Sequence, residues 1–171
     1  TNMEKDPFKS ARLLEKITEQ SDTIQQSMSD IVWTIHPDND KLENMVIRMR
    51  EYLGQTAEAK DFQVEFDVDE KIFKENLGMQ QRQHVFLIFK EAVNNAVKYS
   101  HGKKVVVRLT KENHQIKLSI EDNGIGFDAY GVTSSNGLKN MRERANKLKG
   151  VLNILTSPGK GTKVELSYPT T

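Results

Sequence analysis

Residues 121–128 (Glu-Asp-Asn-Gly-Ile-Gly-Phe-Asp) place a carboxylate next to two glycines that are one residue apart. Glycine has no side chain, so a ligand can approach the backbone at Gly124 and Gly126 where any Cβ would collide with it. The carboxylate of Asp122 can accept a hydrogen bond from an amino group and hold that ligand in one orientation. Turns rich in Asp, Asn and Gly are common, so this stretch alone is weak evidence for a site.

A second set of polar residues lies in segment 80–99, where apolar residues recur at helical spacing. Glu91, Asn95 and Lys98 are four and three residues apart, so they share one face of the predicted helix. The Asn95 carbonyl is a hard oxygen ligand that suits Mg²⁺. Lys98 is placed to meet phosphate charge, and Glu91 could accept a proton or orient a water. Taken alone, this set is more simply interpreted as the polar face of an amphipathic helix.

Two further segments contain glycine at the start of a predicted element. Gly137 opens a helix, and the free N–H groups at a helix start can bind an anion. Residues 159–163 (Gly-Lys-Gly-Thr-Lys) form a turn that leads into a strand with a hydroxyl, that of Thr162, at its start. A plain helix start and an ordinary hairpin turn are the simpler interpretations.

The spacing of apolar residues predicts two helices followed by the order β-α-β-β-α-β-β, an α+β sheet with its helices on one face. Asp40 and Glu43 have the spacing of a capping box at the start of the second helix. Gly150 is placed to close the last helix. Strands are predicted at 62–68, 104–110, 116–120, 151–155 and 163–167, and the later helices at 80–99 and 138–149.

The first helix, over 8–36, carries a narrow apolar seam that we expect to pack on another helix in a bundle or dimer, rather than on the domain's own core. Pro37 ends this helix. The change from helical to alternating spacing near Asp61 predicts a domain boundary there, between regions 1–60 and 61–171. The seam follows heptad spacing and consists of Leu14, Ile17, Ser21, Ile24, Met28, Ile31 and Ile35.

The composition excludes several classes of function. The net charge is +1, so nothing in the balance favours nucleic acid or an anionic membrane as a partner. There is no cysteine, which excludes disulfides and thiolate chemistry. No apolar run is long enough to span a bilayer. The chain starts at Thr1 rather than at a methionine, so we expect a processed product or a piece of a longer protein.

Four motifs in this order resemble the Bergerat-type ATP-binding family, which groups gyrase, Hsp90, MutL and histidine kinases: Glu-x-x-x-Asn on a helix, Asp-x-Gly-x-Gly after a strand, Gly-Leu opening a helix, and Gly-Thr before the last strand. The runs 89–100 and 137–145 resemble sensor histidine kinases of the short-lid branch, related to nitrate and cell-envelope sensors. The resemblance covers roughly residues 60–169 and implies a Bergerat-type α/β sandwich that binds ATP and Mg²⁺.

At the base end of the site, the resemblance implies that Asp122 accepts a hydrogen bond from the adenine amino group. Gly124 and Gly126 would flank the base, and Thr162 would support the adenine through a water. These roles belong to the family and are transferred to the matching positions of this chain.

At the phosphate end, the resemblance implies that Asn95 ligates Mg²⁺ and that Lys98 is a charge partner for phosphate. Gly137 and Leu138 would offer backbone N–H groups to the phosphates. Glu91 occupies the position of the family's proposed base. Phosphoryl transfer depends mostly on positioning and charge neutralisation, which such residues could supply.

The resemblance also implies a histidine that receives the phosphoryl group, but no His-Asp motif of this branch is present. We therefore interpret 8–36 as the second helix of a dimerisation and phosphotransfer hairpin, with the acceptor on a segment missing from this chain. The implied partners are that acceptor helix, a response regulator receiver domain, and a second copy in the full-length protein, which we expect to be anchored in a bacterial inner membrane. The four histidines are His36, His84, His101 and His114.

Other classes of protein fit less well. A dinucleotide site at Gly124-x-Gly126-x-x-Ala129 would need a helix directly after it, and a P-loop would need a further upstream glycine and a Lys followed by Ser or Thr. A degenerate kinase that serves as a nucleotide-binding or dimerisation scaffold is the main alternative. A serine kinase of the anti-sigma-factor type is a third, although the long first helix argues against it.

Overall fold

The computed structural model describes residues 7–128 and 136–170. The chain divides into two compact units, Thr1–His36 and Pro37–Thr171. None of the described helices is long and apolar enough to cross a membrane.

The first unit contains one helix, α1 (Pro7–Ile35), which confirms the helix predicted over 8–36. The apolar side chains of its heptad seam are between 52% and 64% exposed. A stripe of exposed apolar side chains at this spacing is typical of a helix that packs on another helix. Packing of α1 in a bundle or dimer stays a prediction.

The second unit follows the predicted order of elements. Two short 3₁₀ helices, η1 (Pro37–Asn39) and η2 (Glu70–Lys74), were not predicted. The helices and strands are α2 (Leu42–Lys60), β1 (Gln63–Val68), α3 (Met79–Tyr99), β2 (Lys104–Glu112), β3 (Gln115–Asp122), α4 (Asn136–Lys147), β4 (Val151–Thr156) and β5 (Thr162–Pro169).

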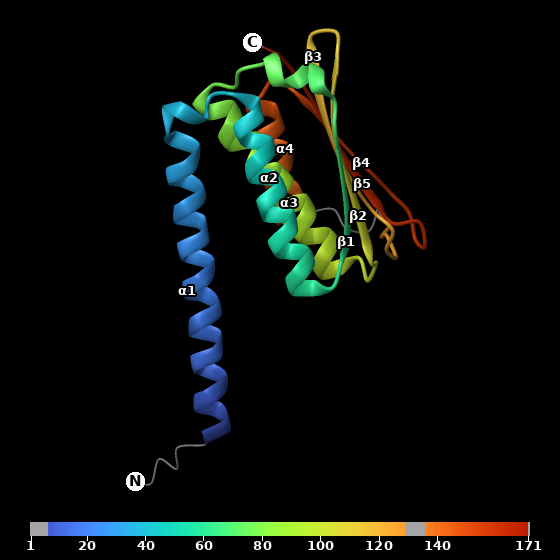
Figure 1. Ribbon diagram of the computed structural model, residues 1–171. Coiled ribbons are helices and arrows are strands. Elements are labelled where there is room, and N and C mark those ends of the chain that lie inside the picture. Colours follow the sequence, from blue (N-terminus) through green and yellow to red (C-terminus); the bar gives the residue numbers. More distant parts are fainter. Residues whose placement is uncertain (1–6, 129–135, 171) are drawn as a thin grey trace. The chain divides into compact units, whose positions relative to one another are not determined.

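The five strands form one mixed sheet in the order β1-β2-β3-β5-β4. β1 pairs with β2 in parallel, and the other pairs are antiparallel. Helices α2, α3 and α4 lie on one face of the sheet (Figure 1). The register places Asp122, the last residue of β3, opposite Thr162, the first residue of β5. The predicted α+β class with helices on one face is therefore confirmed, and two predicted site residues meet at one end of the sheet.

Helix α3 is the centre of the core because it packs against the sheet and against both α2 and α4. The helix predicted over 80–99 is present and has one buried apolar face. Burial of that face orients the adjacent side of α3, which carries Glu91 and Asn95, toward the cavity described below. The buried apolar residues of α3 are Val85, Phe86, Ile88, Phe89, Ala92, Val93 and Ala96.

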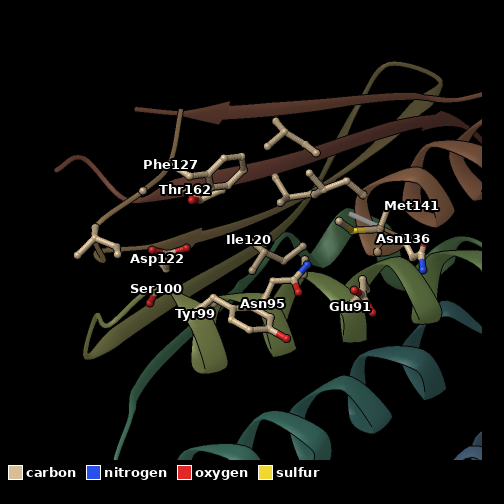
Figure 2. Close-up of a pocket in the computed structure, with 18 residues that line it drawn as sticks. Glu91, Asn95, Tyr99, Ser100, Ile120, Asp122, Phe127, Asn136, Met141 and Thr162 are labelled. Atoms are coloured by element: carbon tan, nitrogen blue, oxygen red, sulfur yellow. The ribbon is translucent and has the colours of Figure 1, made fainter. Parts of the chain in front are cut away.

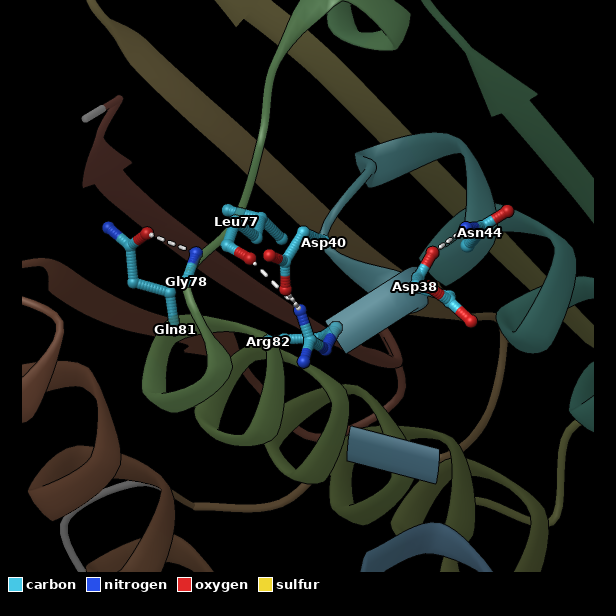
Figure 3. Close-up of polar contacts among 7 residues, drawn as sticks. All are labelled: Asp38, Asp40, Asn44, Leu77, Gly78, Gln81 and Arg82. Atoms are coloured by element: carbon cyan, nitrogen blue, oxygen red, sulfur yellow. Dashed lines mark hydrogen bonds and ion pairs between the residues drawn. The ribbon is translucent and has the colours of Figure 1, made fainter. Parts of the chain in front are cut away.

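The predicted capping box at Asp40 and Glu43 is wrong. Helix α2 begins after Lys41, whose side chain makes no capping hydrogen bond. The Asp40 carboxylate instead forms an ion pair with Arg82 of α3, a guanidinium that is only 1% exposed (Figure 3). A buried charge needs a partner, and Asp40 supplies it.

Segment 40–42, which follows η1, is hydrogen-bonded to segment 75–77, which follows η2. The Leu77 N–H donates to the Asp40 carbonyl at 2.7 Å, and the Leu42 N–H donates to the Glu75 carbonyl at 3.1 Å. The second compact unit begins at Pro37, so the boundary predicted near Asp61 lies inside that unit. The assignment of residues 1–60 to a dimerisation and phosphotransfer region stays a prediction.

Gly150 does not close α4 in the way predicted. The helix ends at Lys147, and the left-handed residue after it is Lys149, with φ of 53°. The Gly150 N–H donates to the Ala145 carbonyl at 2.9 Å. A Cβ at Gly150 would lie 2.6 Å from the Ser167 carbonyl oxygen, so close packing against β5 explains this glycine.

Candidate functional site

A cavity of about 590 Å³ lies between the polar face of α3, the start of α4 and the sheet. Figure 2 shows the Asn95 amide near its middle, with Asp122 toward one end and Glu91 and Asn136 toward the other. The cavity is lined from α3 by Glu91, Ala92, Asn95, Ala96 and Tyr99, from the sheet by Ile120, Asp122, Ile154, Thr162 and Val164, from α4 by Asn136, Gly137, Leu138 and Met141, and from loops by Ser100, Ile125, Gly126 and Phe127.

Asp122 is the charged group at the sheet end of the cavity and is 6% exposed. Its Oδ1 accepts a hydrogen bond from the Gly124 N–H at 2.9 Å. Burial raises the pKa of this carboxyl; hydrogen bonds from the Gly124 and Thr162 N–H groups partly offset the shift, and the charge of Glu121 adds to it. An ionised carboxylate can only accept hydrogen bonds, so this end of the cavity recognises a donor.

The walls around Asp122 are apolar. Ile120 of β3, Val164 of β5 and Ile154 of β4 come from neighbouring strands, and Phe127 comes from the loop after β3. An apolar slot with one buried acceptor suits a flat, largely apolar group that carries an amino group. A purine base with an amino substituent has this character.

The structure shows a packing requirement for the two predicted glycines, and the approach of a ligand to them stays a prediction. A Cβ at Gly124 would collide with the Ser100 carbonyl oxygen, and a Cβ at Gly126 would collide with the Ser157 carbonyl oxygen. Gly126 also has φ of +60°, a conformation that favours glycine. The glycines therefore allow backbone segments to touch one another. Of the two, Gly126 lines the cavity and Gly124 does not.

The other end of the cavity is formed by side chains of α3 and the first residues of α4. Glu91 and Asn95 project from α3, and Asn136 and Gly137 lie at the start of α4. A Cβ at Gly137 would collide with Glu91 Oε1, so the Glu91 carboxylate lies directly against the start of α4. Polar groups on two helices at this end can bind a charged part of a ligand.

The structure brings together seven of the nine predicted site residues as lining of one cavity: Glu91, Asn95, Asp122, Gly126, Gly137, Leu138 and Thr162. Lys98 is exposed in the last turn of α3, and neither it nor Gly124 lines the cavity. Lining a cavity is a matter of position, so the roles of these residues stay predictions.

Several residues at the cavity were not predicted as site residues, among them Tyr99, Phe127 and Asn136, which line it, and Thr156. Tyr99 follows Asn95 by four residues, and this spacing could have placed it on the same helix face. Phe127 lies inside the recognised glycine motif, and Asn136 directly precedes Gly137. Thr156 lies behind the cavity, and nothing in the sequence pattern marked it.

A metal ion at this site would depend on few protein ligands. Among the described residues there is no group of three or more His, Cys, Asp or Glu side chains that could hold one. The Asn95 carbonyl oxygen is of the type that Mg²⁺ accepts when phosphate oxygens and waters complete its coordination. The cavity therefore fits an ion that arrives with a phosphate ligand better than one bound by the protein alone.

The fold is a mixed sheet with three helices on one face. Its cavity combines a buried carboxylate with polar residues of two helices. Together they agree with one family of ATP-binding domains. The family described as histidine kinase-, DNA gyrase B-, and HSP90-like ATPase matches residues 80–171, more than half of the chain, and the chain belongs to this family.

The relatives lie among the sensor histidine kinases. The chain is 27% identical over 162 residues to the sensor histidine kinase LiaS of Bacillus subtilis, covering 94% of this chain and 44% of that protein. It is 31% identical over 158 residues to the sensor protein VraS of Staphylococcus saprophyticus, covering 92% of this chain and 44% of that protein. The chain thus spans less than half of the length of these relatives.

Solved structures agree on the fold. The Acinetobacter baumannii histidine kinase AdeS superposes with a TM-score of 0.68 at 15% identity, covering 93% of this chain and 84% of that chain. The predicted membership of the sensor histidine kinases is confirmed, and the domain is the catalytic ATPase domain of such a kinase.

Proposed function

We propose that the cavity binds ATP with the adenine at Asp122 and the phosphates toward Glu91 and Asn95, for transfer of the γ-phosphoryl group to a histidine. The observation that carries this proposal is the buried Asp122 carboxylate at the apolar end of the cavity. Burying a carboxylate is costly, and its raised pKa records that cost. A ligand that donates a hydrogen bond to it would offset part of this cost.

At the base end, Asp122 would accept from the adenine amino group, and Gly126 would lie beside the base. Gly124 would act indirectly, because its N–H holds the Asp122 carboxylate in place at 2.9 Å. Thr162 would support the base through a water. The position of Thr162 in the cavity, opposite Asp122 across the β3–β5 pair, supports this role.

At the phosphate end, Asn95 would supply an oxygen to Mg²⁺, and Gly137 and Leu138 would place the start of α4 beside the phosphates. The positive end of the helix dipole favours such anions. Lys98 would contribute charge from outside the cavity. Bound ATP and Mg²⁺ would supply the phosphoryl group and the neutralisation of its charge. Glu91 would accept the proton or orient the acceptor, which its position against the start of α4 allows.

The acceptor would be a histidine on a helix outside this chain, from which the phosphoryl group passes to an aspartate of a response regulator. The exposed seam of α1 supports pairing with such a helix, or with a second copy, in the full-length protein. Resemblance alone supports an inner-membrane anchor elsewhere in that protein. The same seam favours the second candidate function, a scaffold that binds nucleotide without transferring phosphate; a serine kinase is the third.

Calorimetric titration with a non-hydrolysable ATP analogue and Mg²⁺ tests the proposal. Asp122→Asn keeps an oxygen for the Gly124 N–H but presents an amide donor where the base amino group needs an acceptor. We expect its affinity to fall about a hundredfold or more, because two donors then face each other.

The matched control is Glu121→Gln, because Glu121 precedes Asp122 on β3, is exposed, and lies 3.8 Å from Arg108. This variant should bind within about threefold of the wild type, since its side chain points to the other face of the sheet. A folded wild-type protein that does not bind the analogue would contradict the proposal and favour a scaffold. Equal binding by the wild type and Asp122→Asn would place the base elsewhere.

A further inference from the structure

Thr156, the last residue of β4, makes a cluster of hydrogen bonds directly behind the base end of the cavity. Its Oγ1 accepts from the Phe127 N–H at 3.0 Å and donates to the Gly161 carbonyl at 3.0 Å. The same atom lies 3.1 Å from Oγ1 of Thr162, which lines the cavity. Thr156 thus joins the glycine loop after β3 to both ends of the β4–β5 turn.

The chemistry of these partners limits the direction of each hydrogen bond. A backbone N–H can only donate and a carbonyl can only accept, and a threonine hydroxyl has a single hydrogen. Either threonine hydroxyl can donate to the other, and the Phe127 carbonyl, 3.5 Å from Thr156 Oγ1, is a second carbonyl acceptor. When the hydrogen of Thr156 goes to the Gly161 carbonyl, which is the shorter of the two carbonyl contacts, the bond between the two threonines needs the hydrogen of Thr162. The Thr162 hydroxyl then has only lone pairs left for a ligand.

The surroundings leave little freedom for another arrangement. The Gly159 N–H donates to the Ile125 carbonyl at 2.6 Å, which holds the turn against the glycine loop. A Cβ at Gly161 would collide with the Asp122 carbonyl oxygen, so that residue is also packed against the end of β3. The three segments that meet at Thr156 are therefore those that surround Asp122.

We propose that Thr156 is a positioning residue that turns the Thr162 hydroxyl into a pure acceptor and so makes the cavity select a base with an amino group over one with a keto group. This inference rests on the proposed function. Asp122 and Thr162 together then present acceptors only. An adenine amino group that reaches them directly meets them as a donor, whereas a hypoxanthine keto oxygen meets lone pairs.

The test compares ADP with inosine diphosphate, which replaces the amino group by a keto oxygen, using calorimetric titration of the whole chain. In the wild type, we expect ADP to bind about a hundredfold more tightly. Thr156→Val keeps the shape but frees the Thr162 hydrogen to donate to a keto oxygen. This variant should weaken ADP about tenfold and reduce the preference for ADP about tenfold. Thr156→Ser keeps the hydroxyl and should restore both values.

A double-mutant cycle distinguishes positioning from a purely structural role. If Thr156 acts through Thr162, the preference for ADP in Thr156→Val/Thr162→Val should equal that in Thr162→Val alone, because no hydroxyl is left to orient. Thr110→Val on β2, outside the cavity, makes the same substitution and should bind as the wild type does. Thr156→Ala gives the same comparison should Thr156→Val not fold.

The outcomes separate this inference from the function on which it rests. Equal weakening of both nucleotides in Thr156→Val, or a cycle in which the two substitutions act independently, would overturn the positioning role while leaving ATP binding in place. A wild type that binds neither nucleotide would overturn the proposed function and this inference with it.

Discussion

At the Asp122 end of the cavity the loops that carry the site touch one another through their backbones, whereas the Glu91 end is formed by two helices that touch through a side chain. Gly126 is packed against the Ser157 carbonyl, and its neighbour Ile125 accepts from the Gly159 N–H. At the other end, Gly137 is packed against the flexible carboxylate of Glu91. One end is therefore fixed by the fold, and the other can rearrange by rotation of side chains.

This difference fits the two parts of the proposed ligand. A base has one shape and one hydrogen-bonding edge, so a slot fixed by the backbone can be complementary to it before it binds. Phosphates are charged and change during transfer, so groups on rotatable side chains and at a helix start suit them. The same change, glycine to alanine, should then have a large effect at the Asp122 end and a small one at the Glu91 end.

Gly126→Ala should have the largest effect. Its Cβ would meet a backbone oxygen at a residue with φ of +60°, so we expect the free energy of unfolding to fall by about 2–4 kcal/mol. ATP-analogue affinity should fall at least about a hundredfold, because the glycine loop can no longer hold its position. Urea unfolding and calorimetric titration measure the two quantities.

Gly159→Ala is the control for backbone conformation, since Gly159 has φ of +78° but open space where a Cβ would be. The free energy of unfolding of Gly159→Ala should fall by only about 1 kcal/mol, which is the cost of the backbone conformation alone. Equal losses of unfolding free energy in the two variants would show that the contact with Ser157 does not matter. The base end would then not be held rigid by this backbone contact.

Asn95→Ala should separate the two ends. We expect affinity for the ATP analogue with Mg²⁺ to fall about 10- to 100-fold, while affinity for adenosine stays unchanged, because only the phosphate part loses a partner. The control is Asn94→Ala. The Asn94 side chain accepts from the Tyr52 hydroxyl at 2.7 Å and does not line the cavity. A fall in adenosine affinity with Asn95→Ala would mean that the two ends are not independent.

The pH dependence of adenosine binding should reveal the buried carboxyl. The raised pKa of Asp122 means that the carboxylate is lost on acidification at a higher pH than the usual value of 3.8. Because the base amino group needs the ionised form, adenosine affinity should fall several-fold as pH drops through that raised pKa. The mutant Asp122→Asn should show no such dependence in titrations between neutral and acidic pH.

Protonation of Asp122 should weaken adenosine binding but stabilise the ligand-free protein. A pKa that is higher in the folded state means that the folded state binds this proton more tightly. The ionised group therefore lowers stability above the folded pKa, and this penalty is relieved as pH falls toward the unfolded value. The difference in stability between Asp122→Asn and the wild type should accordingly shrink on acidification, and a growing difference would contradict the raised pKa.

Gly137→Ala should have the smallest effect on stability. The new Cβ meets the end of the Glu91 side chain, which can rotate away, so we expect a change within about 1 kcal/mol and a few-fold loss of Mg²⁺-dependent affinity. Gly54→Ala in α2 is the control, because Gly54 has open space and should gain about 0.5–1 kcal/mol. A large loss in Gly137→Ala would show that the Glu91 end is as rigid as the base end.

Features set by local spacing were predictable from the sequence. The order of elements and the helix face that carries Glu91 and Asn95 follow from periods of 3.6 and two residues. The strand register was not predicted, and it is the register that brings Asp122 and Thr162 together across the β3–β5 pair.

Features set by distant partners were not predictable. Asp40 has the right spacing for a helix cap, but Arg82, 42 residues away, takes its carboxylate. The glycines were recognised correctly, but what they touch depends on Ser100 and Ser157, which no motif marks. Thr156 was missed for the same reason, since its partners come from three segments.

The length of the seam on α1 sets the size of the partner that could cover it. From Leu14 to Ile35 the seam runs along about 32 Å of the 29-residue helix. Its apolar side chains are more than half exposed over that whole length. A partner helix much shorter than the seam would therefore leave part of this apolar surface in water.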